Sequence, residues 1–306
     1  MPTRQGSFKL FKCFGIEVFL HWSWFLIVLY EIEVRHSLYT SVVWNVLECV
    51  ALFSIVLIHE FGHALACRSV GGQANLIVLW PFGGVAYVAP PQRPGAQLWS
   101  IAAGPLVNVI LVPVLLLLWW LADSAGWNDE LCQYVQAIWT INLVLLIFNM
   151  LPIYPLDGGQ ILRSLLWFIL GRATSLIVAT VIGFLGVAGL IVFVFWTYFI
   201  AHQNSLWLGL ICGFICFNCY RGFVQALELL RLEKAPRHQG LACPNCKMAP
   251  PVGDFYTCGK CRKKFDPFAS KLVCPHCHTA YARMACLECG AISPLDGWAP
   301  GESVNV

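Results

Sequence analysis

The segment from Ser54 to Arg68, SIVLIHEFGHALACR, carries two histidines and a glutamate inside a strongly apolar stretch. Each ionisable residue in the middle of a membrane helix costs about 2.5–3.5 kcal/mol on insertion scales, so a group of them indicates a function. Residues four positions apart share one helical face, and His59 and His63 can therefore bind one metal ion. Glu60 lies beside them and can act as a base on a water molecule at that metal, as in HExxH zinc hydrolases. The alternative is a structural polar contact between helices.

A catalytic zinc ion usually has three protein ligands and a water molecule, so a third ligand is expected elsewhere in the chain. The segment 149–159, NMLPIYPLDGG, offers Asp157. Its two prolines interrupt an apolar stretch, and its two glycines allow close approach of the backbone. Irregular backbone survives at membrane depth only inside protein or beside a water-filled cavity, which suits a buried metal site. The alternative is that Asp157 is the N-cap of a helix that begins near Gln160.

The composition indicates that these residues belong to a membrane protein. Hydrophobic residues make up 58% of the 306 residues and charged residues only 11%, whereas soluble domains carry about 25% charged residues. A helix of about 20 apolar residues crosses a bilayer. We therefore predict an all-α polytopic membrane protein with about six transmembrane helices, at residues 16–34, 42–67, 97–121, 132–151, 174–200 and 205–230.

Two segments between these spans have different patterns. Gln73–Val88 is apolar and β-branched and contains a Pro-Phe-Gly-Gly turn, which is typical of a small membrane-associated β-hairpin. Residues 160–171 predict a short amphipathic helix at the interface. With six spans, the segments rich in Lys and Arg fall on one side of the membrane, which predicts that the N- and C-termini are both cytoplasmic.

Taken in order, these motifs resemble those of the site-2 protease family of intramembrane zinc metalloproteases. The resemblance covers about residues 14–230 and depends on the whole set, because HExxH alone occurs in many zinc enzymes. The matching segments are GIEVFLHW at 15–22, HEFGH at 59–63, PFGG at 81–84, AGPLVN at 103–108 and NMLPIYPLDGG at 149–159.

The resemblance implies a role for each matching residue. One catalytic zinc ion would be bound by His59, His63 and Asp157. Glu60 would be the catalytic base. Asn108, with Asn149 as a second candidate, would help to place the substrate or the oxyanion. For both asparagines an interhelical hydrogen bond is the alternative.

The activity implied is zinc-dependent endopeptidase cleavage within or near a transmembrane segment of another membrane protein, as in regulated intramembrane proteolysis. The implied location is a bacterial inner membrane. A helical substrate hides its peptide bonds, and the hairpin edge could capture an unwound segment by strand addition. The alternative is that the hairpin only plugs the site.

The chain after residue 240 is polar and mildly basic and contains four CxxC pairs. Such pairs are typical of tetrahedral zinc sites. Disulfides are the alternative, but the expected cytoplasmic location is reducing. Pairing consecutive motifs predicts two zinc ribbons, 243–261 and 274–289, with one structural zinc ion each. The expected ligands are Cys243, Cys246, Cys258, Cys261, Cys274, Cys277, Cys286 and Cys289.

We therefore predict an intramembrane metalloprotease domain at 1–230, a linker at 231–240 and a double zinc-ribbon domain at 241–306. The ribbons could dock a protein regulator. Six apolar spans argue against nucleic acid as the main partner, despite the basic residues at 260–264. The alternative function is a catalytically silent membrane scaffold that binds clients through its ribbons. A transporter would show paired broken helices in two repeat halves, and the sequence indicates one broken span and no repeat.

Overall fold

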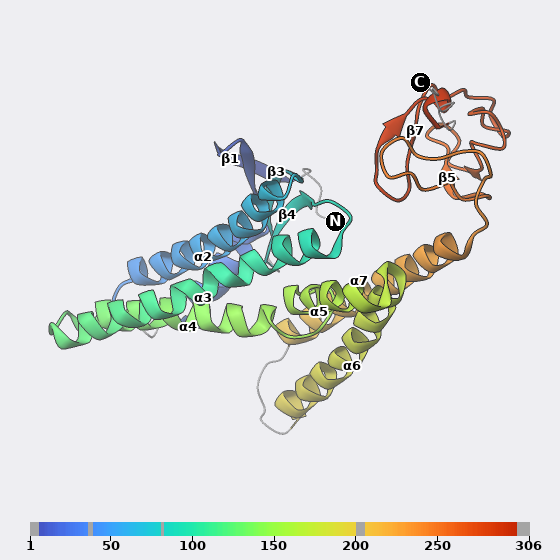
Figure 1. Ribbon diagram of the computed structural model, residues 1–306. Helices are drawn as coiled ribbons and strands as arrows, with labels where there is room; N and C mark the ends of the chain where they lie inside the picture. Colours follow the sequence, from blue (N-terminus) through green and yellow to red (C-terminus); the bar gives the residue numbers. More distant parts are fainter. Residues whose placement is uncertain (1–5, 36–38, 81–82, 200–205, 299–306) are drawn as a thin grey trace. The chain divides into compact units, whose positions relative to one another are not determined.

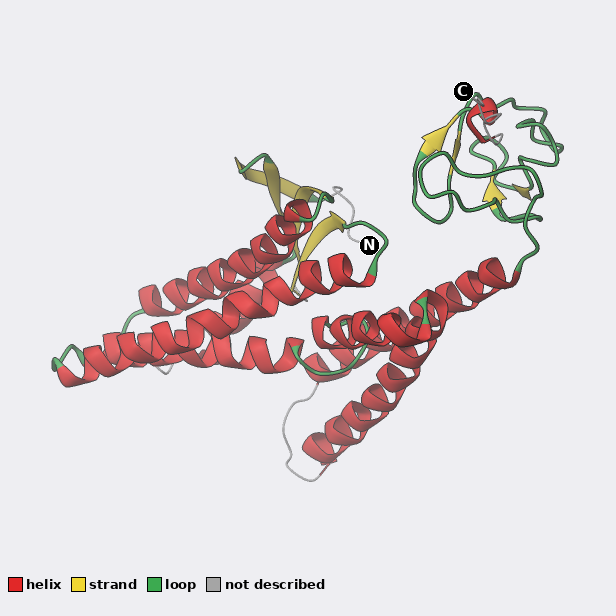
Figure 2. Cartoon of the chain, viewed as in Figure 1, coloured by secondary structure: helices red, strands yellow, loops and turns green. Residues whose placement is uncertain are grey.

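The structure, a computed structural model, describes residues 6–35, 39–80, 83–199 and 206–298 (Figure 1). The chain forms two compact units, Met1–Phe223 and Val224–Val306. The division falls inside the last long helix, α7 (Leu206–Lys234). The first unit is mostly helical, whereas the second consists mainly of loops with short strands (Figure 2).

Five helices among the described residues are long and apolar enough to cross a membrane. Many of their large apolar side chains are exposed, as expected where lipid rather than water surrounds a helix. These helices confirm the predicted spans from residue 42 onward, and the protein is an integral membrane protein. They are α2 (Val42–Ser69), α3 (Pro94–Ser124), α4 (Asp129–Asn149), α6 (Arg172–Phe199) and the segment Gly209–Lys234 of α7.

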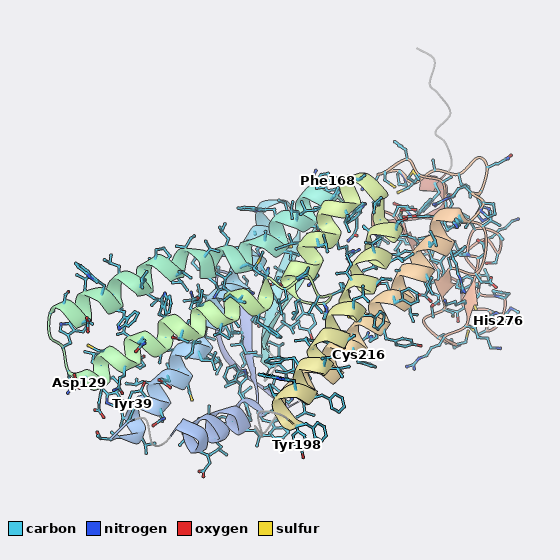
Figure 3. The ribbon with its side chains drawn as sticks, turned by 90° about the horizontal axis from the view of Figure 1, so that it is seen from below. Tyr39, Asp129, Phe168, Tyr198, Cys216 and His276 are labelled. Carbon is cyan, nitrogen blue, oxygen red and sulfur yellow. The ribbon has the colours of Figure 1, made fainter. Side chains whose placement is uncertain are left out.

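The ends of α2 and α4 meet near Tyr39 and Asp129, which lie close together in Figure 3. Glu130 accepts hydrogen bonds there from the backbone N–H and the hydroxyl of Thr40, at 2.7 and 2.6 Å. It also accepts one from the Trp44 indole at 2.9 Å. One carboxylate thus joins the segment before α2 to the first turn of α4.

The predicted first span at residues 16–34 is wrong. Its residues form the strand β2 (Ile16–His21) and a separate helix, α1 (Trp24–Arg35), whose 12 residues are too few to cross a bilayer. The preceding strand β1 (Ser7–Cys13) pairs antiparallel with β2. In a short apolar segment rich in β-branched and aromatic residues, periodicity does not distinguish a strand from a buried helix.

Together, β2 and α1 are nearly as long as α2. Arg68, in the last turn of α2, donates hydrogen bonds to the carbonyls of Phe14 and Gly15 in the β1–β2 turn. From that end the chain extends about 20 Å through β2 and about 18 Å through α1, against roughly 42 Å for α2. The contacts of Arg68 place the β1–β2 turn at the Ser69 end of α2.

The first unit, Met1–Phe223, is called the membrane unit below, and it contains one four-stranded sheet in the order β1-β2-β3-β4. Strands β3 (Gln73–Trp80) and β4 (Gly83–Ala89) pair antiparallel and confirm the predicted hairpin, although Pro81 and Phe82 of its turn lie outside the described residues. β2 runs parallel to β3, so the hairpin is part of a larger sheet with β4 at one edge. A buried cluster joins this sheet to α2 and includes Ile16, Val18, Ala64, Cys67, Ile77 and Leu79.

The second unit has a small core and little regular structure. Trp298 is only 1% exposed and packs edge-on against Phe268, with ring centroids 4.7 Å apart. So small a core indicates that other bonds must hold the loops together. The strands are β5 (Tyr256–Thr257) with β6 (Lys264–Phe265) and β7 (Met284–Ala285) with β8 (Ile292–Ser293), followed by the 3₁₀ helix η1 (Leu295–Trp298).

Asp266 connects separate loops of this unit. Its Oδ2 accepts hydrogen bonds from His238 Nε2 at 2.9 Å and from the Gly253 N–H at 2.8 Å. Its Oδ1 accepts from the N–H groups of Phe268 and Ala269 at 3.0 and 3.2 Å. Burial alone would raise the pKa of this carboxyl group, but the hydrogen bonds from Gly253 and His238 outweigh burial and lower the pKa.

Replacing Asp266 with Asn should destabilise this unit by about 2–4 kcal/mol, because the new NH₂ group cannot accept from the donors that face one of the two oxygens. Hydrogen exchange of the loop amides in full-length protein would measure this loss. Since the folded-state pKa is lowered, the stabilisation is complete above the ordinary carboxyl pKa of about 3.9 and is lost as the pH falls through the lowered value. Unchanged exchange in Asp266→Asn would contradict the assigned role.

Candidate metal centre

Three predicted metal ligands meet inside the membrane unit. His59 and His63 are buried on α2, with 4% and 8% of each residue exposed. Asp157, the first residue of α5 (Asp157–Leu170), reaches the same point from a position 98 residues further along the chain than His59. Its Oδ2 lies 3.0 Å from His59 Nε2 and 3.4 Å from His63 Nε2, and the two Nε2 atoms are 3.1 Å apart.

These spacings fit a single tetrahedral zinc ion. With zinc–ligand bonds of about 2.0–2.2 Å, the donor atoms of a tetrahedral site lie roughly 3.3–3.6 Å apart. The measured distances of 3.0, 3.1 and 3.4 Å agree with this geometry to within a few tenths of an ångström. Two imidazoles and one carboxylate are also the ligand types of a catalytic zinc site that leaves a fourth position for water.

The glycines after Asp157 allow α5 to start against the preceding loop. A Cβ on Gly158 would lie 2.4 Å from Met150 O, and one on Gly159 would lie 2.4 Å from Tyr154 N. The N-cap of α5 is Leu156, so the alternative role of Asp157 as an N-cap is wrong. The predicted short helix is confirmed as α5, which begins at Asp157 itself.

Both histidines are oriented by hydrogen bonds at Nδ1, on the far side of the ring from Asp157. His63 Nδ1 donates to Ser100 O at 2.9 Å, and because a carbonyl only accepts, the proton must be on Nδ1. His59 Nδ1 lies 2.5 Å from Asn108 Oδ1. Partners of this kind fix the ring orientation and the tautomer of a metal-binding histidine, which leaves Nε2 available to the metal.

The edge strand β4 holds Glu60 in place. Glu60 Oε2 accepts a hydrogen bond from the Ala86 N–H at 2.8 Å. On the same strand, a Cβ on Gly84 would lie 2.2 Å from Glu60 Cγ, so only glycine fits there. The hairpin therefore sets the position of the candidate base.

Replacing Gly84 with Ala should push the Glu60 carboxylate out of position and lower catalytic activity about 100-fold, the typical effect of a 1 Å misplacement. The metal content should not change, because the three atoms nearest to a Cβ at Gly84 all belong to Glu60 and not to a histidine. Gly189→Ala is the matched control, since a Cβ at Gly189 meets no described atom within 4 Å. Equal activity of the two variants would show that β4 does not position Glu60.

The two predicted asparagines have different surroundings. Asn108 is fully buried on α3 and contacts His59 at Nδ1, away from the ligand atoms, which favours an orienting role over contact with an oxyanion. It also makes the alternative, interhelical hydrogen bond, to Asn142 on α4. Asn149 is the last residue of α4 and partly buried, and its role stays a prediction. Asn142 was not among the predicted site residues, because its only signal in the sequence is an asparagine inside an apolar span.

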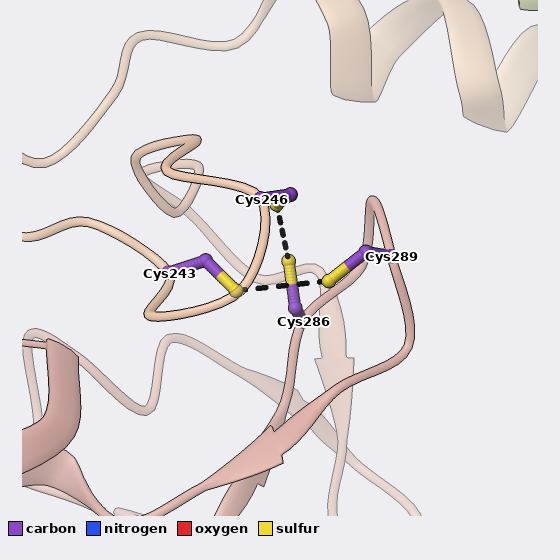
Figure 4. A group of neighbouring side chains, drawn as sticks. All are labelled: Cys243, Cys246, Cys286 and Cys289. Atoms are coloured by element: carbon purple, nitrogen blue, oxygen red, sulfur yellow. Dashed lines mark hydrogen bonds between the residues drawn. The ribbon is translucent and has the colours of Figure 1, made fainter.

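The eight predicted cysteine ligands of the second unit form two clusters, but the predicted pairing of consecutive motifs is wrong. The first CxxC pair meets the fourth, with Cys243–Cys289 and Cys246–Cys286 sulfur distances of 3.7 Å (Figure 4). The second pair meets the third, with sulfur distances of 3.6 and 3.7 Å. The clusters are Cys243, Cys246, Cys286 and Cys289, and Cys258, Cys261, Cys274 and Cys277.

The sulfur spacing distinguishes zinc sites from disulfides. A disulfide bond is about 2.05 Å long, whereas zinc–sulfur bonds of about 2.3 Å hold tetrahedral sulfurs roughly 3.8 Å apart. The measured distances match the second value, and all eight cysteines are free thiols. The geometry therefore suits two structural zinc ions, each closed by four sulfurs.

Comparisons with known proteins find zinc metalloproteases similar to this chain. Residues 48–126 and 120–193 match the family model of peptidase family M50. The chain is 35% identical over 179 residues to "Zinc metalloprotease MJ0392" of Methanocaldococcus jannaschii, covering 58% of this chain and 50% of that protein. It is 31% identical over 194 residues to "Putative zinc metalloprotease sll0528" of Synechocystis, covering 58% and 49%.

A solved structure, "Site-2 Protease from Methanocaldococcus jannaschii", has a TM-score of 0.50 and 27% identity to this chain, and the match covers 71% of this chain and 95% of that one. The chain spans about half the length of the curated relatives it matches. The two matches to the family model of peptidase family M50 together span residues 48–193, which lie within the first unit. The cysteine clusters lie outside the residues that match the family model.

Proposed function

We propose that this protein is a zinc-dependent intramembrane endopeptidase that cleaves other membrane proteins within or near a transmembrane segment. The observation that carries the proposal is the meeting of His59, His63 and Asp157 at zinc-ligand spacing beside the buried Glu60. Three ionisable ligands buried in a membrane unit would be costly without a metal to pair with them.

Zinc and Glu60 would have separate roles in peptide-bond hydrolysis. When bound, zinc supplies Lewis-acid activation of water and of the scissile carbonyl. Glu60 accepts a proton from the attacking water as the C–O bond forms, and it returns the proton to the amine as the C–N bond breaks. The Ala86 N–H holds Glu60 at the edge of the sheet until the substrate arrives.

The sheet edge suits an extended substrate. β4 is an edge strand, and it runs past Glu60. A substrate helix that unwinds could add to this edge as a further strand and so bring a peptide bond close to the base. We propose this as the means of capture in regulated intramembrane proteolysis.

We further propose a bacterial inner membrane with both termini in the cytoplasm, where β2 and α1 together supply one crossing before α2. When α2, α3, α4, α6 and α7 cross in turn, one side receives the helix ends at or near Arg68, Arg93, Arg172 and Arg231. Arg163 lies in α5, which connects α4 to α6 on that side. The positive-inside tendency assigns that side to the cytoplasm. The cysteine clusters would then be in a reducing compartment with two structural zinc ions, and they would be able to dock a protein regulator.

The test compares membrane-protein fragments in cells that carry wild type or Glu60→Gln. We expect at least one single-span protein to accumulate uncut in the variant and to be released by wild type. If the fragment patterns match while deletion of residues 240–306 still alters the cells, the protease proposal fails and a scaffold that acts through its cysteine clusters is favoured.

A further inference from the structure

Among the described residues, Asn142 on α4 makes no hydrogen bond to a predicted metal ligand. It does bond to Asn108, which contacts the predicted ligand His59. Both asparagines are fully buried, with 0% of each residue exposed. Asn142 Nδ2 donates to the backbone oxygen of Asn108 at 3.0 Å. Asn108 Nδ2 donates to Asn142 Oδ1 at 2.8 Å. The result is a two-point contact between α3 and α4 behind His59.

The directions of these bonds follow from one fixed acceptor. A backbone carbonyl can only accept, so the Asn142 group that faces Asn108 O must be its NH₂. Asn142 Oδ1 therefore faces the Asn108 side chain and must receive its NH₂ group. This leaves Asn108 Oδ1 pointing toward His59 Nδ1, 2.5 Å away.

The same logic reaches the metal site. An amide oxygen only accepts, so His59 Nδ1 must carry the proton, and Nε2 then presents its lone pair toward Asp157 and His63. If the Asn108 amide turned over, its NH₂ would face His59 Nδ1. The ring would then have to move its proton to Nε2, where the proton would block the metal.

We infer that Asn142 is a positioning residue: it prevents the Asn108 amide from turning over and so holds His59 in its metal-binding tautomer. The inference rests on the proposed function, because it assumes that His59 Nε2 binds zinc. Asn108 contacts His59 directly, and Asn142 would be a further orienting partner, one residue more distant from the metal. The competing explanation is that Asn108 and Asn142 only fasten α3 to α4.

The experiment measures zinc binding by full-length purified protein in competition with a graded series of chelators. Asn142→Leu leaves Asn108 free to turn, and we expect the zinc affinity of the intramembrane site to fall about 10–100-fold, as for other lost orienting partners. Leu is well tolerated in a membrane helix, and rescue by the second substitution described below would show that the first unit has folded. Asn218→Leu is the matched control, since the Asn218 amide donates to Phe214 O in its own helix.

A second substitution separates the two explanations. Adding Asn108→Asp to Asn142→Leu should restore zinc affinity, because a carboxylate offers His59 Nδ1 an acceptor whichever way it turns. A fastening role predicts no such rescue, since the introduced charge cannot rejoin the helices. Wild-type affinity in Asn142→Leu, or no rescue in the double variant, would overturn the inference. Absence of intramembrane zinc from wild type itself would overturn the proposed function and the inference with it.

Discussion

Replacing Glu60 with Gln should lower peptide-bond cleavage by about 10²–10⁴-fold, the usual contribution of a general base, while the protein keeps its intramembrane zinc. The amide has nearly the shape of the carboxylate but cannot take the proton from water. Glu60 is bonded to the Ala86 N–H rather than to either histidine, so its loss should not disturb the metal ligands. Cleavage of a single-span substrate in lipid, measured with zinc content, tests this prediction.

Asp157→Asn is the contrasting variant. It removes the negative ligand that lies 3.0 and 3.4 Å from the two histidines, so we expect it to lose both zinc and activity. If Glu60→Gln also lost zinc, Glu60 would be acting as a ligand. If Glu60→Gln retained full activity, another group would have to be the base.

In the second unit the first CxxC pair meets the fourth and the second meets the third. This pairing predicts how many structural zinc ions remain after two cysteines are replaced. Cys246→Ser with Cys286→Ser damages one cluster of the structure, so one cysteine-bound zinc ion should remain. Cys246→Ser with Cys258→Ser damages both clusters, so neither should remain intact. Zinc contributes roughly 10–16 kcal/mol to the folding of such sites at neutral pH, so the difference should be large.

Metal analysis of the two double variants in the full-length protein decides between pairings, because each carries two Cys→Ser changes and they differ only in position. Consecutive pairing gives the opposite result: Cys246→Ser with Cys258→Ser would leave one zinc ion, and Cys246→Ser with Cys286→Ser would leave none. The result predicted by consecutive pairing would contradict the structure of this unit.

The sequence was sufficient to predict that His59, His63 and Asp157 would meet, because the signals for these residues are local or strongly marked. His59 and His63 are one helical turn apart, which fixes their shared face without any knowledge of the fold. Asp157 is distant in sequence, but the prolines and glycines around it have few uses inside an apolar segment. The structure brings all three together at zinc-ligand spacing.

The first span could not be predicted correctly, because both answers satisfy the same physical requirement. Backbone groups at membrane depth must be paired, and residues 16–21 achieve this by pairing with β1 and β3 instead of forming a helix. The partner β3 is about 60 residues away in the chain, and nothing within residues 16–34 records its presence.

Pairing of the CxxC motifs and the contribution of Asn142 were missed for a similar reason. Each CxxC pair supplies two ligands of the same kind, so the spacing along the chain does not say which pairs share a metal. A buried asparagine in a membrane helix usually bonds to another helix, and only the contact from Asn142 through Asn108 to His59 connects it with the metal site.

The most direct test of the central claim is anomalous X-ray scattering at the zinc absorption edge from crystals of the wild-type protein grown in lipid. We predict three zinc peaks per chain, two within the cysteine clusters and one about 2 Å from His59 Nε2, His63 Nε2 and Asp157 Oδ2. Two peaks confined to the cysteine clusters, in zinc-replete protein, would contradict the assignment of an intramembrane zinc hydrolase.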